Sequence, residues 1–205
     1  GNGLLVIADE QTSGKGRHGR AWHSPPGLGL WMSLGIDNAP PGLLFASALA
    51  VRDALAPWLQ AAVKWPNDIQ HEGRKLAGLL VEQRGERTAL GIGLNVNHTR
   101  EDFPEDLRDV ATSVRIAWGE ALHRADVLGA LLTALDDALE QLHGGAFAAI
   151  HRQWAEACGL EGKKVRQGAL EGIVTRIDER GALHLRTPQG DHTSPFGDIV
   201  ILERD

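Results

Sequence analysis

Apolar residues in the first half of the chain occur in short runs bounded by turn-forming residues, a pattern typical of strands. The runs that predict strands cover residues 4–8, 30–36, 63–65, 75–83 and 89–96. Because the first run is short and apolar throughout, we expect Leu4–Ala8 to be a buried strand. A helix is predicted over residues 43–60, where apolar residues follow helical spacing among strong helix formers.

The second half of the chain begins with helical spacing and then changes to short strands. Seven apolar residues follow the i, i+3, i+4 rule and predict an amphipathic helix over 124–142: Val127, Leu128, Leu131, Leu132, Leu135, Leu139 and Leu142. Gly144 and Gly145 end it, and a second helix is predicted over 147–157. Further strands are predicted over 164–167, 170–177, 182–187 and 199–202. We therefore expect two domains, residues 1–157 and residues 158–205, the second a small all-β barrel or sandwich packed on the first.

Composition narrows the class of protein. The 205 residues carry a net charge of −6, which disfavours binding to a polyanion such as nucleic acid. The single cysteine, Cys158, excludes a disulfide within the chain and indicates a reducing, cytoplasmic compartment. No apolar run approaches the roughly 20 residues that a membrane-spanning helix needs. The composition leaves open a local basic site for a small anionic ligand.

Residues 11–29 form a glycine- and arginine-rich stretch that contains a literal match to the dinucleotide fingerprint, from Gly14 to Gly19. That fingerprint requires a helix at its third glycine, and Pro25 and Pro26 bar a helix here. The glycines instead allow close approach of a ligand to the backbone, while Lys15, Arg17 and Arg20 concentrate positive charge. On these residues alone, a solvated flexible loop is an equal alternative.

Two later segments also place polar side chains at strand ends. Lys64-Trp65-Pro66-Asn67-Asp68 presents an amide and a carboxylate directly after a strand, although it is also a good β-turn sequence. Lys75 begins an apolar strand, and Gly78 within that strand indicates a close backbone approach or a bulge. A third strand, rich in glycine, ends at Asn95, which is a ligand contact or an ordinary turn former.

Taken in order, four segments resemble the signatures of biotin–protein ligases, also called biotin–[acetyl-CoA-carboxylase] ligases. The segment from Gln11 to Trp22 resembles that family's biotin-binding loop. Three others are similar to its next three signatures: residues 64–68, 74–78 and 91–95. Any one of them is weak evidence, but all four in this order are highly specific. The resemblance extends from about Ile7 through the C-terminal β-domain.

The resemblance implies a fold and a set of roles. The fold would be α+β, with a class II synthetase-like catalytic domain of the biotin/lipoate ligase type around a mixed sheet, followed by a small SH3-like barrel. Biotin would be held by Gln11, Gly14, Lys15, Gly16, Arg17, Lys75 and Gly78. ATP or the adenylate would be held by Arg17, Arg20, Trp22, Asn67, Asp68, Lys75 and Asn95. Catalysis would fall to Lys75, Arg17, Arg20 and Asp68.

The same resemblance implies the ligands and the partner. ATP would arrive with Mg²⁺, biotin would be the substrate, and a biotin carboxyl carrier domain of a carboxylase would accept the biotin on a lysine. The polar stretch after Asn95, including residues 103–112, would be a second loop that orders when the adenylate forms. The resemblance leaves the oligomeric state and the metal ligands undefined.

Two departures from the family pattern bear on these roles. Lys15 stands where the family's commonest loop has arginine, and lysine keeps the charge but loses bidentate geometry. Nothing before Gln11 matches the Ser/Thr-Thr-Asn segment that helps members bind the ureido ring of biotin. Because the chain begins as if inside a strand, we expect that segment to lie in upstream residues absent from this sequence.

Three other hypotheses compete with this one. A lipoate– or octanoate–protein ligase of the same superfamily would need room for a long aliphatic tail, whereas the first two signatures resemble the biotin branch. A biotin-responsive repressor would need a DNA-binding domain, and no helix-turn-helix is visible here, so the resemblance is to the single-function type. A binding module without catalysis would have little reason to retain all four signatures.

Overall fold

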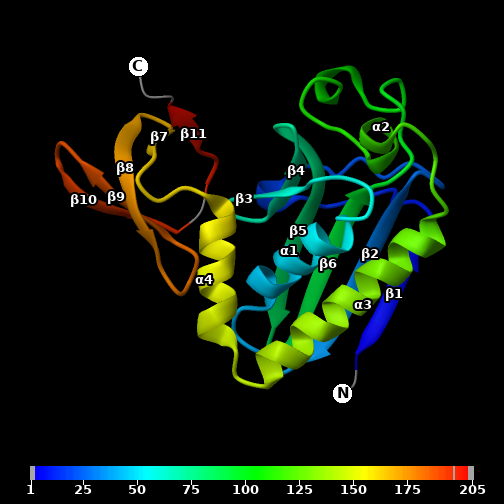
Figure 1. The fold of residues 1–205 in the computed structure, drawn as a ribbon, viewed down its shortest axis with the longest axis horizontal. Coiled ribbons are helices and arrows are strands. Elements are labelled where there is room, and N and C mark those ends of the chain that lie inside the picture. The colour runs from blue at the N-terminus through cyan, green and yellow to red at the C-terminus, as the bar shows by residue number, and fades with distance from the viewer. Residues whose placement is uncertain (1–2, 196, 203–205) are drawn as a thin grey trace.

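The computed structural model describes residues 3–195 and 197–202, so the final three residues of the expected second domain lie outside the described part. Two sheets and a layer of helices make up the molecule (Figure 1). The α+β class predicted from the sequence is confirmed. No helix in the described ranges is long and apolar enough to cross a membrane.

The main sheet has six strands in the order β1-β2-β6-β5-β4-β3. Their bounds are β1 Leu4–Ala8, β2 Gly29–Asp37, β3 Ala62–Lys64, β4 Asp68–His71, β5 Arg74–Arg84 and β6 Arg87–Asn95. Each pairing between neighbouring strands is antiparallel, which refines the expectation of a mixed sheet. The parallel component is an isolated bridge between Lys75 and Ala111. The short strand β4 was missed by the sequence analysis, which placed only a turn there.

The expectation that Leu4–Ala8 is buried is wrong. This strand, β1, lies at the edge of the sheet and pairs with β2 alone. Leu4 is 67% exposed and Val6 is 53% exposed. An apolar run predicts a strand because of its residue types, but burial depends on a neighbour that the described residues do not supply on this side.

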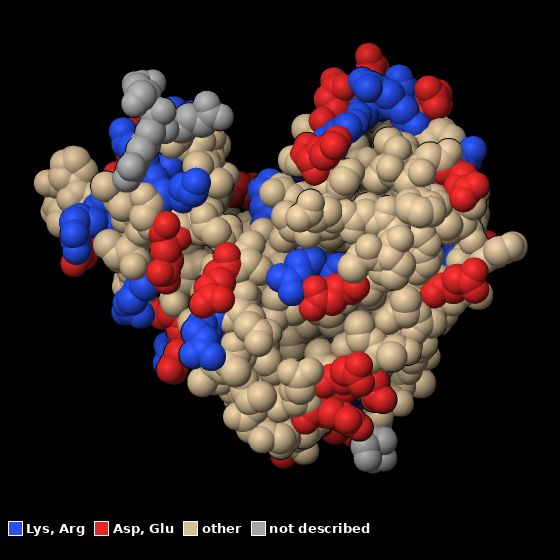
Figure 2. All heavy atoms as spheres, in the orientation of Figure 1, with Lys and Arg blue, Asp and Glu red and all other residues tan. Residues whose placement is uncertain are grey.

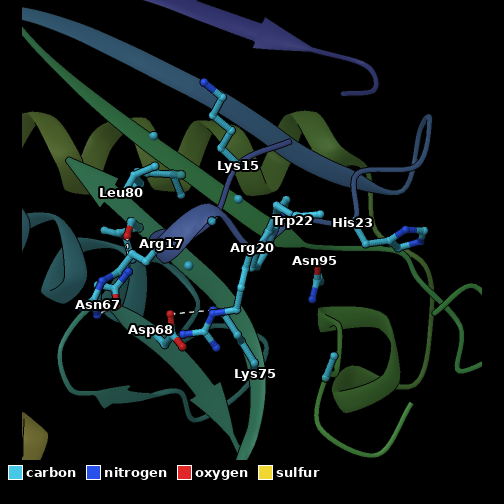
Figure 3. A pocket seen from close by; sticks show the side chains of 18 of the residues that line it. Lys15, Arg17, Arg20, Trp22, His23, Asn67, Asp68, Lys75, Leu80 and Asn95 are labelled. Atoms are coloured by element: carbon cyan, nitrogen blue, oxygen red, sulfur yellow. Dashed lines mark hydrogen bonds and ion pairs between the residues drawn. The ribbon is translucent and has the colours of Figure 1, made fainter. Parts of the chain in front are cut away.

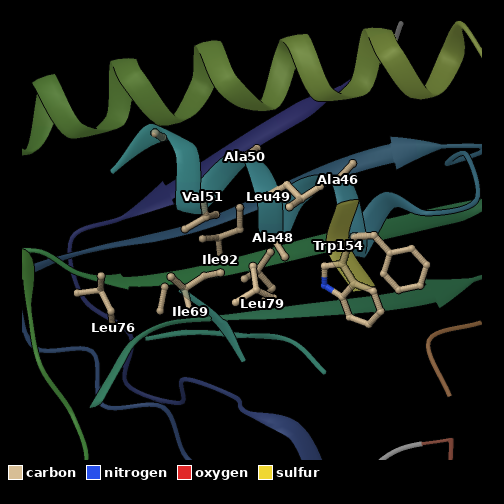
Figure 4. Packing of buried hydrophobic residues seen from close by; sticks show 14 of the residues in the cluster. Ala46, Ala48, Leu49, Ala50, Val51, Ile69, Leu76, Leu79, Ile92 and Trp154 are labelled. Carbon is tan, nitrogen blue, oxygen red and sulfur yellow. The ribbon is translucent and has the colours of Figure 1, made fainter. Parts of the chain in front are cut away.

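Three helices cover one face of the main sheet: α1 Leu43–Ala54, α3 Arg124–His143 and α4 Phe147–Cys158. Helix α1 packs directly on the strands, and its alanines let it lie close to Ile69, Leu79 and Ile92 (Figure 4). It ends six residues earlier than the predicted 43–60, because Pro57 lacks the N–H that would continue the helix. A short helix, α2 Val114–Trp118, was not predicted.

The second sheet has five antiparallel strands in the order β10-β9-β8-β7-β11. Their bounds are β7 Lys164–Gln167, β8 Leu170–Ile177, β9 Leu183–Thr187, β10 Gly190–Ser194 and β11 Val200–Leu202. Strand β10 was missed because its residues are polar and its pattern resembles a loop. Within the described ranges no pairing joins β10 to β11, so the closure expected of an SH3-like barrel is not observed and the sheet is open.

The second sheet packs against the helical layer of the first region. The indole N–H of Trp65 donates to the carbonyl of Gly181 at 2.8 Å, and a ring nitrogen of His151 lies 2.7 Å from the carbonyl of Asp178. Burial raises the pKa of the Cys158 thiol to about 12, so this last residue of α4 stays protonated and unreactive. The boundary at 157/158 remains a prediction, and it falls one residue before the end of α4.

Candidate functional site

A cavity of about 600 Å³ lies against the main sheet. Its walls come from the loop between β1 and β2, the β3–β4 turn, strands β5 and β6, the loop after β6, and the segment before β11. In the space-filling view, a hollow separates the region of the second sheet from the charged loop 99–109 (Figure 2). Segments far apart in sequence thus form one concave site.

The floor of the cavity is made of strand residues with little or no side chain. Side chains alternate across a sheet, so Leu79 and Ile92 enter the core while Gly78, Gly91 and Gly93 face the other way. A β-carbon on Gly93 would come within 2.5 Å of the indole nitrogen of Trp22. The glycines therefore allow Trp22 to lie directly on the sheet.

Lys75 lies at the centre of the site, where β5 begins. Its ammonium is 2.8 Å from a carboxylate oxygen of Asp68 and 5.1 Å from the ring centroid of Trp22, so it is held by an ion pair and a cation–π contact. Its backbone N–H donates to Val110 at 2.8 Å, and its carbonyl accepts from Thr112 at 2.8 Å. The residue is thus fixed at both its side chain and its backbone, and a partly buried ammonium acts strongly on a nearby anion.

Arg17 reaches the site from a short 3₁₀ turn, η1 (Arg17–Gly19). Its guanidinium donates to the side-chain oxygen of Asn67 at 2.9 Å. The amide of Asn67 in turn donates to the carbonyl of Leu79 at 2.5 Å, and the N–H of Leu79 donates back to the carbonyl of Asn67 at 2.9 Å. Asn67 is buried and connects the loop arginine to the sheet.

Arg20 pairs with Asp198, a residue from the other end of the chain, at 3.0 Å. The two side chains are 62% and 78% exposed, so this ion pair contributes little to stability and an anionic ligand could readily replace the carboxylate. Figure 3 shows Arg17, Arg20 and Lys75 gathered around Asn67 and Asp68. Three cations thus surround one end of the cavity.

These features agree with what comparisons with known proteins reveal. The first 98 residues match the family model described as biotin/lipoate A/B protein ligase family. The chain is 34% identical over 214 residues to the biotin–[acetyl-CoA-carboxylase] ligase of Paracoccus denitrificans, a match that covers 96% of this chain and 89% of that protein. The chain belongs to the biotin–protein ligase family. The prediction made from the four signatures is therefore confirmed.

Two further relatives define the extent of the likeness. The bifunctional ligase/repressor BirA of Bacillus subtilis (strain 168) is 37% identical over 216 residues, which cover 97% of this chain. The chain spans only 66% of that relative's length. The solved structure of the biotin protein ligase from Aquifex aeolicus in complex with biotin and ATP matches with a TM-score of 0.82 and 27% identity. That match covers 98% of this chain and 89% of the Aquifex chain.

Eleven of the twelve residues assigned to the site from sequence line the cavity of this ligase-family chain: Gln11, Lys15, Gly16, Arg17, Arg20, Trp22, Asn67, Asp68, Lys75, Gly78 and Asn95. The twelfth, Gly14, does not. A β-carbon at Gly14 would lie 2.5 Å from the carbonyl oxygen of Trp22. The backbone N–H of Trp22 donates to the carbonyl of Gly14 at 2.9 Å. Gly14 therefore stabilises the conformation of the first loop from outside the cavity.

Lys15 lines the cavity but lies apart from Arg17, Arg20 and Lys75 (Figure 3). Gln11 is held by the hydroxyl of Ser24, which donates to its side-chain oxygen at 2.8 Å. Asn95 is buried and donates to the carbonyl of Thr112 at 3.0 Å, which ties the end of β6 to the second loop. These contacts position the loops, while the ligand roles expected of the three residues remain predictions.

The cavity wall also includes residues to which the sequence analysis gave no individual role: Ser13, Ser33, Lys64, Leu80, Phe103, Asp198 and Ile199. Ser13, Lys64 and Phe103 lie in segments that the resemblance had marked, whereas the other four do not. Lys64 and Leu80 could have been found, because each alternates with a core residue in its strand. Asp198 carried no such signal, because it reaches Arg20 across 178 positions of sequence. Among the described residues, no group of three His, Cys, Asp or Glu side chains is arranged to hold a metal ion.

Proposed function

We propose that this chain activates biotin with ATP to give biotinyl-5′-adenylate and then transfers the biotin to a lysine of a biotin carboxyl carrier domain. The observation that carries the proposal is the gathering of three cations, Arg17, Arg20 and Lys75, at one end of a glycine-floored cavity. Family membership and the likeness to the Aquifex enzyme bound to biotin and ATP support it.

The first step requires two anions to meet. An oxygen of the biotin carboxylate attacks the α-phosphorus of ATP, a new oxygen–phosphorus bond forms, and pyrophosphate leaves with the electrons of the broken bond. In this proposal Lys75 bridges the carboxylate and the α-phosphate, and Arg17 and Arg20 offset the remaining phosphate charge. Positioned cations of this kind supply most of the catalysis in phosphoryl-type displacements.

Magnesium would enter as part of the ATP substrate. Mg²⁺ is typically held by one or two carboxylates together with phosphate oxygens, and Asp68 is the carboxylate placed deepest in the cavity. Asp68, which contacts Lys75 in this structure, would hold the ion, and the ion would neutralise phosphate charge. This fits a site with a single inner carboxylate and no preformed metal cage among the described residues.

The second step releases AMP. The amine of the carrier lysine attacks the acyl carbon of the mixed anhydride, an amide forms, and the acyl–oxygen bond to AMP breaks. We assign to Asp68, the carboxylate beside Lys75 in the cavity, the role of orienting the amine or taking its proton. The names of the relatives support a carrier of acetyl-CoA carboxylase as the partner, and the single cysteine supports a cytoplasmic location.

Biotin-dependent exchange of labelled pyrophosphate into ATP tests the proposal directly. We expect exchange with biotin and none with lipoate or octanoate, which would separate this function from that of lipoate ligases in the same family. The assay is run with the given chain. Absence of biotin-dependent exchange would refute the proposal.

A further inference from the structure

An aromatic cluster connects the two loops that flank the cavity. It consists of Trp22 in the first loop, Trp31 in β2, and His98 and Phe103 in the second loop. Trp22 and Trp31 meet edge to face at 6.4 Å, as do Trp31 and His98 at 5.8 Å, and His98 stacks on Phe103 at 4.8 Å between centroids with 12° between planes. Phe103 is itself part of the cavity wall. The cluster therefore runs from the cavity floor to the second loop.

His98 is the polar member of this cluster and lies in an unfavourable place. Its side chain is 0% exposed, and neither ring nitrogen has a hydrogen-bond partner among the described residues. Its backbone carbonyl, by contrast, accepts a hydrogen bond from the hydroxyl of Ser113 at 2.6 Å. A buried imidazole without partners costs free energy, and a charged one costs far more. The second loop can therefore keep the position that it has in this structure, which we call closed, only with an uncharged ring at residue 98.

The titratable groups that face His98 come from two elements. His23 in the first loop lies 6.2 Å away between centroids, and Asp102 lies within the second loop itself. The carboxylate of Asp102 is already held by Thr99, through the backbone N–H at 2.7 Å and the hydroxyl at 2.8 Å, and it also feels the charge of Arg115. Asp102 is therefore poorly placed to compensate a proton on His98.

The two loops are also joined by a direct bond. The Nε2 of His23 lies 3.0 Å from the carbonyl oxygen of Asp102, so its N–H donates across the gap. Movement of the second loop would break this contact and expose the ring of His98 together with Phe103. Any such movement would remove Phe103 from the wall of the cavity.

We infer that His98 is a positioning residue whose uncharged ring locks the second loop against the first, so that protonation of this one side chain opens the wall of the cavity. It touches no reacting atom and acts through Phe103. The effect of loop opening on retention of the adenylate rests on the proposed function, whereas the movement of the loop on protonation of His98 does not.

The direction and size of the effect follow from linkage. Burial, and next the charge of His23, lower the pKa of His98 from 6.5 to about 4 in the closed state. Opening returns the ring to water and its ordinary pKa, so the open state binds a proton first as the pH falls below 6.5. Between pH 7.5 and 5.5 the ratio of open to closed loop should therefore rise about tenfold. The stabilisation of the closed loop is complete above pH 6.5 and is lost as the pH falls from there towards 4.

Hydrogen–deuterium exchange of the ligand-free chain tests this without any enzymatic activity. Exchange at residues 99–110 is compared at pH 7.5 and 5.5, after correction for intrinsic rates, in the wild type, His98→Phe and the matched control His192→Phe on exposed β10. We expect the tenfold rise in the wild type and the control, and no rise in His98→Phe. A rise that persists in His98→Phe would overturn the inference and assign the pH dependence to another group, His23 first.

A second variant covers the chance that Phe fails to fold at this position. His98→Gln is neutral at every pH and should flatten the pH dependence in the same way. With biotin and ATP bound, release of adenylate into solvent should rise about tenfold from pH 7.5 to 5.5 in the wild type only. If no adenylate forms at any pH, the proposed function fails, while the exchange result still decides the role of His98.

Discussion

The two faces of the main sheet are built from the same strands and do opposite things. On the helix-covered face, Leu79 and Ile92 are fully buried against α1, and their packing stabilises the fold. On the other face, Gly78 and Gly93 leave room for Trp22 and the cavity. Side chains alternate along β5 and β6, so period-2 geometry directs Leu79 and Ile92 into the core, although both residues also border the cavity.

This comparison teaches that stability and chemistry can be changed separately in one strand. Substitutions on the core face should change the free energy of unfolding and leave the cavity unchanged. Substitutions on the cavity face should change ligand binding and leave unfolding nearly unchanged. Four predictions test that separation, in decreasing order of expected effect.

The largest effect is expected on the cavity face, at Lys75. Replacing it with alanine in Lys75→Ala removes the cation that would bridge the two reacting anions, so pyrophosphate release should fall by about 10²–10³-fold, or roughly 3–4 kcal/mol. Biotin-dependent pyrophosphate release measures the loss, and chemical denaturation checks that the fold persists. Lys163→Ala, at an exposed lysine outside the cavity, is the matched control and should behave as wild type. Normal release from Lys75→Ala would refute the role assigned to it.

On the core face, Leu79→Ala should destabilise the fold by about 2–5 kcal/mol, because it leaves a void between β5 and α1. The free energy of unfolding from urea denaturation measures this loss. Activity is then measured without urea, at a temperature at which the variant is folded. Activity per folded molecule should stay within about twofold of wild type, since the neighbouring residues Gly78 and Leu80 still face the cavity. A large loss of activity in the folded variant would contradict the separation of the two faces.

Two glycines in β6 form a matched pair on the cavity face. Gly93→Ala places a methyl group 2.5 Å from the Trp22 indole and must displace it, whereas the same change at Gly91 meets nothing closer than 3.6 Å. We expect Gly93→Ala to weaken biotin binding by about 1–3 kcal/mol and Gly91→Ala to have a much smaller effect. Calorimetric titration with biotin measures both affinities. Equal losses in the two variants would show that Trp22 is not what the glycine floor accommodates.

The smallest effect is expected at the rim. Asp198→Asn removes an exposed ion pair with Arg20, so the free energy of unfolding should change by no more than about 0.5 kcal/mol. Urea denaturation at low and high salt measures the free energy of unfolding. The difference between wild type and variant should shrink as salt screens the ion pair. A loss above about 2 kcal/mol would mean that the rim contributes to the core of the fold rather than to the site alone.

Local patterns were sufficient for much of this molecule. Apolar runs and helical spacing predicted the strands of the main sheet except β4, the helices α3 and α4, and the strands of the second sheet except β10. The four signatures predicted which residues meet in the cavity, with Gly14 as the exception. These features depend on residue types and on the spacing of neighbours, which the chain carries wherever it folds.

Other features were decided only by the tertiary structure. The exposure of β1 depends on its place at the sheet edge, and the pairing of Arg20 with Asp198 depends on how the second sheet packs. The burial of the His98 ring, with no hydrogen-bond partner in the described part of the chain, depends on three segments that meet around it. The residue types themselves determined the alternation of side chains along each strand, the turns and the local charge. Contacts between distant segments depend instead on which surfaces cover one another, and this is settled only when the whole chain packs.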